Sequence, residues 1–242
     1  MLSSLSIVVP AFNEAHTIAT TVEDAVRLGS SVARELEVIV CNDGSQDDTG
    51  SIVRELAAQE PRVRLLDRQH NSGIEASLRA LYVHARYEWV FLMAADLQWR
   101  IQALVDLSRA AECGADFVIG VRTNRRAIYT PYRRLVSWGY EKIVRALGAP
   151  GRDPGSIKLA RRDLMVAAVA SRGVFAEGER QIRAARSGAR VVEVAVEFRQ
   201  RDFGSATGAR RDVVARALLD AARVTSSLLV GWPRPQPPKS DL

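Results

Sequence analysis

SIVVPAFNE, residues 6–14, is an apolar, β-branched run that stops at a proline and continues into an asparagine and a glutamate. CNDGSQDDT, residues 41–49, closes a second run of the same kind with polar residues. A buried strand is typically a short continuous apolar run bounded by turn residues. Both stretches are therefore predicted to be strand ends, with Asn13, Glu14 and Asp43 placed where the chain leaves the sheet.

This pattern repeats through the first half of the chain. The predicted strands are residues 5–9, 36–40, 63–66, 89–93 and 117–121, and the helical patterns between them cover about 15–28, 47–59, 73–86 and 101–113. Strands that alternate with helices predict βαβ units and a mostly parallel sheet, in an α/β fold. Ligands bind such sheets at the carboxyl ends of the strands, so the polar residues after each run form the candidate site.

The second half of the chain is less regular. Helices are predicted at 132–147, 177–187 and 209–229, and strands at 157–160 and 191–198. The helix 209–229 is amphipathic. One face would carry Val213, Val214, Ala217, Leu218, Ala221 and Val224, with Arg210, Arg216, Asp220 and Arg223 elsewhere. The proline-rich end, residues 231–242, is predicted to be disordered.

Size and charge narrow the class of protein. The chain has 242 residues, 47% of them apolar, which suits one large α/β domain. The formal net charge is +6, and only three of the 34 basic residues are lysines. Arginine grips phosphate oxygens in a bidentate way, so phosphate-bearing partners are favoured, although genome composition can produce the same bias. No nucleic-acid-binding motif is present, and we expect no nucleic-acid partner.

Cellular location is indicated by what the sequence lacks. Cys41 and Cys113 show neither metal-ligand spacing nor a disulfide framework. The longest apolar run, residues 89–95, is far short of the roughly 20 residues that span a bilayer. Residues 1–10 do not read as a secretory signal. We expect a cytoplasmic protein, either soluble or peripheral at the inner face of the membrane.

Together, the two strand-end stretches resemble the opening of family 2 glycosyltransferases, in which two such motifs occur in this order and at this separation. Each stretch alone is also explained by helix capping. The resemblance implies a GT-A (Rossmann-like) fold, with a mostly parallel sheet flanked by helices and a C-terminal amphipathic helix. It implies a catalytic domain over 1–208, with a nucleotide-sugar half at about 1–122 and an acceptor half at about 123–208. The amphipathic helix 209–230 and the tail 231–242 would follow.

The resemblance assigns a donor site. NSGIEAS, residues 71–77, is similar to the segment after the third strand in this family, where Gly73 would allow close backbone approach or simply start a helix. The implied nucleotide-sugar-binding residues are Pro10, Ala11, Asn13, Glu14, Asp43, Gly73, Ala95 and Asp96.

A metal site is implied by MAADLQ, residues 93–98, which resembles the DADLQ motif of dolichyl- and polyprenyl-phosphate sugar (mannose) synthases. Asp96 and Gln98 match the positions whose oxygens hold Mg²⁺ or Mn²⁺ on the donor diphosphate. Ala94 replaces the first aspartate of that motif. This change leaves three alternatives: a weaker metal site, an impaired enzyme, or compensation by Glu14 or Asp43. Asp96 as a plain helix cap is the structural alternative.

Phosphate-binding residues are implied in the second half. DFVIGVR (116–122), YRRLVS (132–137) and the segment 191–205 resemble stretches of the dolichyl-phosphate mannose synthase group, in which the equivalents of Arg122, Arg133 and Ser137 contact phosphates. The alternative to phosphate binding is a solvated basic helix face, to which Arg125, Arg126 and Arg134 would belong. DPGSIK, residues 153–158, resembles a longer motif of the group. The implied catalytic residues are Asp96, Glu179, Arg122, Arg133, Ser137 and Arg201.

Glu179 has two alternative roles. In related inverting enzymes a carboxylate near this position is the general base for an alcohol acceptor. A phosphate acceptor is already ionised, so Glu179 would instead orient an arginine.

The reaction implied is metal-dependent, inverting transfer of a hexosyl or N-acetylhexosaminyl group from a nucleoside diphosphate sugar. The expected acceptor is a polyprenyl phosphate, with a soluble small molecule or a carrier-bound intermediate as the alternative. A non-catalytic nucleotide-sugar-binding homologue is the third reading, because of Ala94. The helix 209–229 would make peripheral membrane contact, pack on the domain, or form a homodimer.

Overall fold

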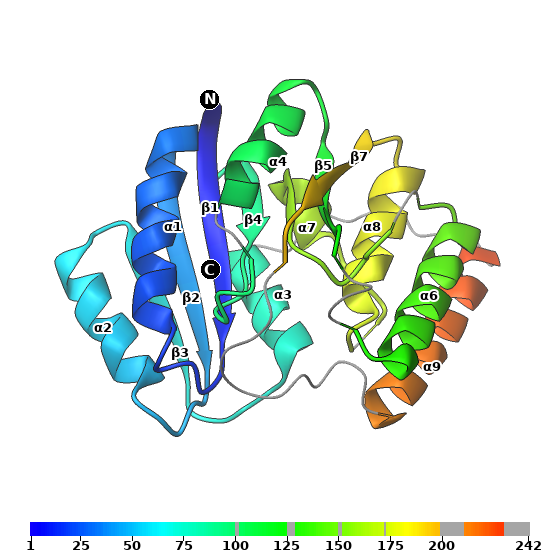
Figure 1. Ribbon diagram of the computed structural model, residues 1–242, viewed down its shortest axis with the longest axis horizontal. Coiled ribbons are helices and arrows are strands. Elements are labelled where there is room, and N and C mark those ends of the chain that lie inside the picture. Colours follow the sequence, from blue (N-terminus) through cyan, green and yellow to red (C-terminus); the bar gives the residue numbers. More distant parts are fainter. Residues whose placement is uncertain (100–101, 125–128, 150–151, 172, 199–210, 230–242) are drawn as a thin grey trace.

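The computed structural model describes residues 1–99, 102–124, 129–149, 152–171, 173–198 and 211–229 (Figure 1). Within these residues, seven strands form one sheet in the order β3-β2-β1-β4-β6-β5-β7. The strands are β1 (Leu2–Ala11), β2 (Ala33–Asp43), β3 (Val63–Arg68), β4 (Trp89–Leu92), β5 (Phe117–Arg122), β6 (Lys158–Arg161) and β7 (Val191–Val196). β6 is antiparallel to β4 and β5, and the other paired strands are parallel. The predicted mostly parallel sheet is confirmed.

Helices cover both faces of this sheet. They are α1 (Ile18–Val32), α2 (Thr49–Gln59), α3 (Ile74–His84), α4 (Gln102–Glu112), α6 (Pro131–Ala146), α7 (Arg162–Val166), α8 (Ala176–Arg186) and α9 (Arg211–Leu229). Each helix predicted from the sequence is present within a few residues of its expected bounds. The short helix α7 was not predicted, because five residues are too few to show a helical period.

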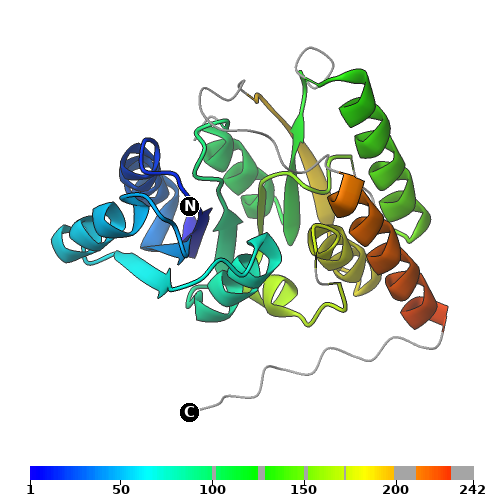
Figure 2. The same cartoon turned by 90° about the horizontal axis from the view of Figure 1, so that it is seen from below.

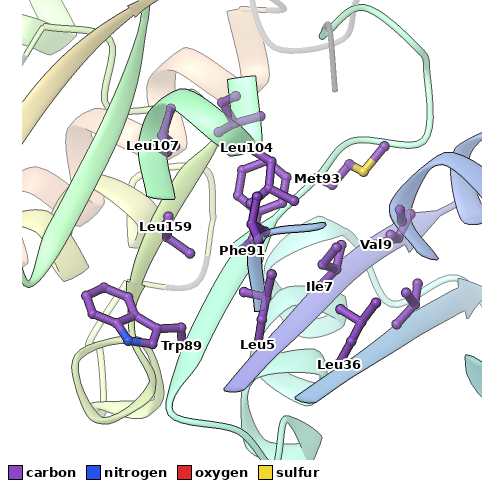
Figure 3. Close-up of a cluster of buried hydrophobic side chains, with 14 of the residues drawn as sticks. Leu5, Ile7, Val9, Leu36, Trp89, Phe91, Met93, Leu104, Leu107 and Leu159 are labelled. Carbon is purple, nitrogen blue, oxygen red and sulfur yellow. The ribbon is translucent and has the colours of Figure 1, made fainter. Parts of the chain in front are cut away.

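Side chains alternate between the two faces of the strands, and this alternation divides the core. Ile7 and Val9 of β1 point to the layer formed by α1, α2 and α4. Figure 3 shows Phe91 of β4 in the same cluster, packed with Leu104 of α4. Val8, between Ile7 and Val9, joins the opposite cluster with residues of α3, α7 and α8. The strand runs are apolar on both faces because helices bury both faces.

A third cluster lies at one edge of the molecule, where α6 and α9 run side by side in both views (Figures 1 and 2). Ala221 and Val224 of α9 are buried there with Val144 of α6 and Ile182 of α8. The packed stripe of α9 therefore faces the rest of this domain. Among the described residues, no helix has both the length and the apolar character needed to cross a membrane.

Two residues of α9 depart from the predicted apolar face. Leu218 is 54% exposed, because the contact follows the narrow stripe of Ala217, Ala221 and Val224, and position 218 lies one helical step to the side. Asp220, expected on the polar side, is buried and accepts a hydrogen bond from Arg223 Nη1 at 3.0 Å. The predicted disordered tail, 231–242, lies outside the described residues.

Candidate active site

A pocket of about 340 Å³ opens at the carboxyl ends of β1, β4 and β5. α3, α6 and the start of α8 complete its walls. The lining residues include Pro10, Ala94 and Arg122 from the strand ends, Arg133, Val136, Ser137 and Tyr140 from α6, Glu75 from α3, the turn Asp153–Ile157, and Glu177 from α8. The pocket thus brings together Arg122, Arg133 and Ser137, predicted as catalytic residues, with Pro10, predicted as a donor-binding residue.

Asp43, at the end of β2, is buried, and both of its oxygens are engaged. Oδ1 accepts hydrogen bonds from Ser72 N at 3.0 Å and from Arg68 Nη1 at 3.1 Å, and Oδ2 accepts one from Gly73 N at 2.8 Å. The carboxylate therefore holds the loop that leads into α3. Gly73 has a φ of 88°, and this left-handed backbone is the reason for glycine here.

The loops after β1 and β2 are joined by short polar contacts. Asn13, with a φ of 55°, donates its backbone N–H to Ser45 Oγ at 2.9 Å and accepts Gln46 N at its Oδ1 at 2.9 Å. Glu14 N donates to Thr49 Oγ1 at 2.9 Å. α1 begins at Ile18 with Thr17 as its N-cap residue, so Asn13 does not cap that helix. Ala11, also placed in the donor site, is buried at the end of β1.

Residues 94–98 form a turn after β4 rather than a helix cap. Asp96 Oδ1 accepts Gln98 N at 3.2 Å, and Leu97 has a φ of 53°. The carbonyl oxygen of Ala95 accepts the Thr21 hydroxyl at 3.1 Å. α4 begins only at Gln102, so Asp96 does not cap it. Ala94 lines the pocket.

Arg122 is clamped at the end of β5 by a partner that the sequence did not identify. Its Nε donates to Asp153 Oδ2 at 2.6 Å, Nη2 donates to Oδ1, and its backbone N–H donates to Oδ2 at 3.1 Å. The guanidinium carbon lies 5.1–5.5 Å from the ring centres of Trp99, Tyr129 and Phe198. Burial opposes the charged form, but Asp153 outweighs it and raises the pKa of Arg122, which therefore stays cationic.

Arg133 and Ser137 lie one helical turn apart on α6. The Thr130 hydroxyl accepts Arg133 N at 3.2 Å and caps the helix, and Pro131 occupies its first turn. The Arg133 guanidinium stacks over the Tyr129 ring at 4.0 Å. Among the described residues it forms no ion pair with an acid. The first two turns of α6 therefore present a positive charge and a hydroxyl to the pocket, near the positive end of the helix dipole.

A buried charge cluster lies beneath the pocket, and sequence reasoning missed it. Lys158 is fully buried, and its Nζ donates to Glu177 Oε2 at 2.8 Å and to the Pro154 carbonyl at 2.9 Å. Arg180 Nη1 donates to Glu177 Oε1 at 2.8 Å, and Arg180 Nη2 lies 3.8 Å from Glu75 Oε1. Burial would raise the pKa of Glu177, but Lys158 and Arg180 outweigh it, and the pKa lies below its usual value. All three carboxylates that line the pocket, those of Glu75, Asp153 and Glu177, are thus paired with cations.

Two predicted catalytic residues, Asp96 and Glu179, are not among the residues that line the pocket. Glu179 is fully buried. Its oxygens accept hydrogen bonds from Ala170 N at 2.9 Å and Ser171 N at 2.8 Å, and Arg183 pairs with it at 2.7 Å. The structure thus places Glu179 with an arginine and a loop. Arg201 lies outside the described residues, as do Arg125 and Arg126.

Known proteins resemble this chain in both sequence and fold. The family model "Glycosyl transferase family 2" matches residues 6–165. A prophage bactoprenol glucosyl transferase homolog of Escherichia coli K12 is 30% identical over 178 residues, which are 72% of this chain and 58% of that protein. Dolichyl-phosphate beta-glucosyltransferase ALG5C of Trichomonas vaginalis is 30% identical over 163 residues, 60% of this chain and 47% of that protein. The chain thus spans about half the length of the curated relatives it matches.

Solved structures show the same fold. Glucosyl-3-phosphoglycerate synthase of Mycobacterium tuberculosis, in complex with Mn²⁺, UDP-glucose and phosphoglyceric acid, superposes with a TM-score of 0.71 at 19% identity. The match covers 91% of this chain and 80% of that protein. The complex of the same synthase with Mg²⁺ and UDP gives a TM-score of 0.67 at 20% identity, over 94% of this chain and 79% of that one. At this identity the likeness bears on the fold alone.

Proposed function

The chain belongs to glycosyl transferase family 2, and from this premise we propose that it transfers a sugar from a nucleoside diphosphate sugar to a polyprenyl-phosphate-type acceptor. The pocket at the carboxyl ends of β1, β4 and β5 carries this proposal, because it combines Arg122 and Arg133 with mostly apolar walls. Two anionic phosphate groups and a hydrocarbon chain need such a surface. The names of the curated relatives, which refer to bactoprenol and dolichyl phosphate, support the same class of acceptor.

The donor would bind over the ends of β1 and β2. Asn13 and Glu14 lie in the loop after β1, where backbone hydrogen bonds to the loop after β2 hold them. Asp43 ends β2, and its carboxylate holds the loop before α3. A loop held in this way can receive a nucleoside without being reordered, which lowers the cost of binding.

The residues after β4 fit a divalent cation. Asp96 and Gln98 would supply two hard oxygen donors from one turn. The described residues contain no group of three or more His, Cys, Asp or Glu side chains that could hold a metal ion, at this turn or at any other place, so the protein would supply few of the ligands. Mg²⁺ typically binds one or two carboxylates and takes its remaining ligands from substrate phosphates and water. We therefore propose Asp96 and Gln98 as the protein ligands of Mg²⁺ or Mn²⁺. The bound ion would neutralise charge on the leaving diphosphate.

The proposed reaction needs no general base from the protein. An oxygen of the acceptor phosphate attacks the anomeric carbon and forms the new bond. The bond to the nucleoside diphosphate breaks on the opposite face, and its electron pair leaves with the diphosphate, so the configuration inverts. Arg133 and Ser137 would hold the acceptor phosphate, and Arg122 would face the developing charge. The pairing of Glu177 with Lys158 and Arg180 agrees with chemistry that uses no carboxylate base.

The proposal is tested first by donor binding. Thermal shift and calorimetry with a panel of nucleotide sugars, UDP-glucose among them, should reveal one donor whose affinity depends on Mn²⁺. Asp96→Ala should abolish the Mn²⁺-dependent part of that affinity and leave the melting temperature of the free protein nearly unchanged. Unchanged Mn²⁺-dependent affinity in this variant would exclude Asp96 as the metal ligand.

The same panel separates the alternatives. Donor binding without hydrolysis or transfer to any acceptor would identify a non-catalytic homologue, as Ala94 suggests. Transfer to a water-soluble acceptor alone would replace the lipid acceptor in the proposal and leave the donor chemistry intact.

A further inference from the structure

Large hydrophobic side chains are exposed on one edge of the molecule. Nine such side chains are exposed among the described residues, and five of them belong to α6 and α9. These five, called here the edge residues, are Tyr132, Leu135, Trp138, Leu218 and Leu219. Their exposed fractions range from 47% to 64%. Apolar surface gathered in one place on a protein typically marks a binding surface.

The geometry of α6 ties this edge to the pocket. Tyr132, Leu135 and Trp138 follow one another at intervals of three residues and point outward, whereas Arg133 and Ser137 line the pocket. One helix therefore presents an exposed apolar stripe and a wall of the pocket side by side. A partner that covers the stripe would lie beside the mouth of the pocket.

The charges around the edge residues are mostly positive. Arg134, Lys142 and Arg145 of α6 are exposed, and the Lys142 ammonium lies 5.7 Å from the centre of the Trp138 ring. The acid of α6, Glu141, accepts Asp153 N at 3.2 Å, on the side of the pocket. On α9, the acid whose side chain the structure describes, Asp220, is buried. Aromatic and aliphatic side chains surrounded by basic residues suit the surface of an anionic bilayer.

An apolar groove lies next to the pocket, on the side of this edge. It has a volume of about 180 Å³ and lies between α6 and α9. Val136, Tyr140 and Val174 line both the groove and the pocket, and the exposed Leu218 lines the groove. The pocket and the edge are therefore linked by shared apolar side chains, which suit a hydrocarbon chain.

We propose that the edge residues, with the basic residues around them, dock the protein on an anionic lipid bilayer and bring the mouth of the pocket to the level of the headgroups. This inference rests on the proposed lipid-phosphate acceptor, which would be presented at that level. It also assigns the main contact to α6. The sequence had placed this contact on the apolar stripe of residues 209–229, but that stripe packs within the domain.

A second copy of the chain fits this edge less well. A two-fold contact places the same patch on both partners. Such a contact would gather Arg134, Lys142 and Arg145 from both copies, with no exposed acid on the described part of the edge to offset them. Like charges directly opposed across a contact are destabilising.

Cosedimentation with vesicles tests the docking surface. The full chain is mixed with vesicles of phosphatidylcholine alone or of phosphatidylcholine with phosphatidylglycerol. The test variant is Leu135→Ser/Trp138→Ser, and the control is Val83→Ser, which removes an exposed side chain from α3, away from the α6–α9 edge in Figure 1. Mn²⁺-dependent binding of UDP and size-exclusion mass are measured for each protein.

We expect the wild-type protein to bind anionic vesicles, and to bind them more weakly as salt rises, because the screening length falls from about 10 Å at 0.1 M to about 3 Å at 1 M. The double variant should lose at least about tenfold in partition, because it removes two large apolar side chains from the lipid contact. Its UDP binding should be unchanged, and Val83→Ser should behave as wild type.

Three outcomes would overturn the docking surface. The first is that the wild-type protein does not bind vesicles at low salt, and the second is that both variants lose vesicle binding equally. The third is that the wild type is a dimer, which Leu135→Ser/Trp138→Ser converts to a monomer without changing vesicle binding. Each outcome leaves donor binding standing. If the wild-type protein did not bind UDP in the presence of Mn²⁺, the proposed function itself would be contradicted.

Discussion

The two halves of the molecule hold their polar residues in different ways. At the ends of β1 and β2, polar groups bond mainly to nearby loops, as Asp43 does with Ser72 N and Gly73 N in addition to Arg68. In the second half, buried ions hold one another across elements, as Lys158 does with Glu177. The first arrangement follows from short motifs read in order. The second depends on how α8 packs against β6, and it should respond far more strongly to the loss of a single charge.

The largest effect is expected from Lys158→Met, which keeps the length of the side chain and removes its charge. Breaking a buried pair costs about 3–5 kcal/mol of unfolding free energy, and the low end applies because Arg180 still faces Glu177. Urea titration measures the loss. The matched control, Arg27→Ala, removes an exposed ion pair and should cost under about 1 kcal/mol. If the two variants lost the same free energy of unfolding, the proposed difference between the two halves would be wrong.

Asp153→Asn should have the next largest effect. The variant keeps the shape of the clamp on Arg122 and loses its charge-assisted hydrogen bonds, which contribute roughly 1.5–3 kcal/mol. Because Arg122 would face the developing charge in our proposal, kcat should fall while KM for the acceptor and Mn²⁺-dependent affinity for the donor stay nearly the same. A loss of donor affinity with an unchanged kcat would contradict this role of Arg122.

Ala94→Asp should produce a smaller change, in the opposite direction. It restores the carboxylate that the related motif carries, beside the turn that holds Asp96. An added hard oxygen ligand should tighten Mn²⁺-dependent donor binding by about tenfold, or ~1.4 kcal/mol, measured by calorimetry. A loss of binding in a folded variant would mean that the pocket is built around a small residue at position 94.

The smallest effect is expected when the pH is lowered and the stability of the protein is measured. The folded pKa of Glu177 lies below its usual value of 4.5, because the attraction of Lys158 and Arg180 outweighs burial. This group therefore contributes stability that is present above pH 4.5 and is lost as the pH falls through the folded pKa. Wild type should lose more stability than Lys158→Met over that range in thermal melts. If the stabilities of the two proteins fell equally with pH, Lys158 would not be stabilising the ionised form of Glu177.

The sequence predicted the fold well because its signals are local. Apolar runs located each strand of the first half, although β1 and β2 are longer than predicted because they pair from Leu2↔Ala33 to Ala11↔Asn42. The motif residues Arg122, Arg133 and Ser137 do meet in one pocket.

Contacts between residues far apart in the chain could not be predicted from the sequence. Nothing in a single chain marks Asp153 as the partner of Arg122, 31 residues away, or Glu177 as the partner of Lys158. Glu179 and Glu177 are equally plausible in the sequence, since they lie on the same turn of α8. Only the packing decides that Glu177 lines the pocket and Glu179 does not.

The central claim is that this pocket moves a sugar from a nucleotide to a lipid phosphate with Asp96 as the metal ligand. The most direct test incubates the protein with a radiolabelled nucleotide sugar, Mn²⁺ and a short-chain polyprenyl phosphate, and measures label extracted into organic solvent. We expect a labelled lipid with inverted anomeric configuration from the wild type and none from Asp96→Ala. A wild type that binds the donor but labels no lipid, or an Asp96→Ala variant that labels it equally well, would contradict the claim.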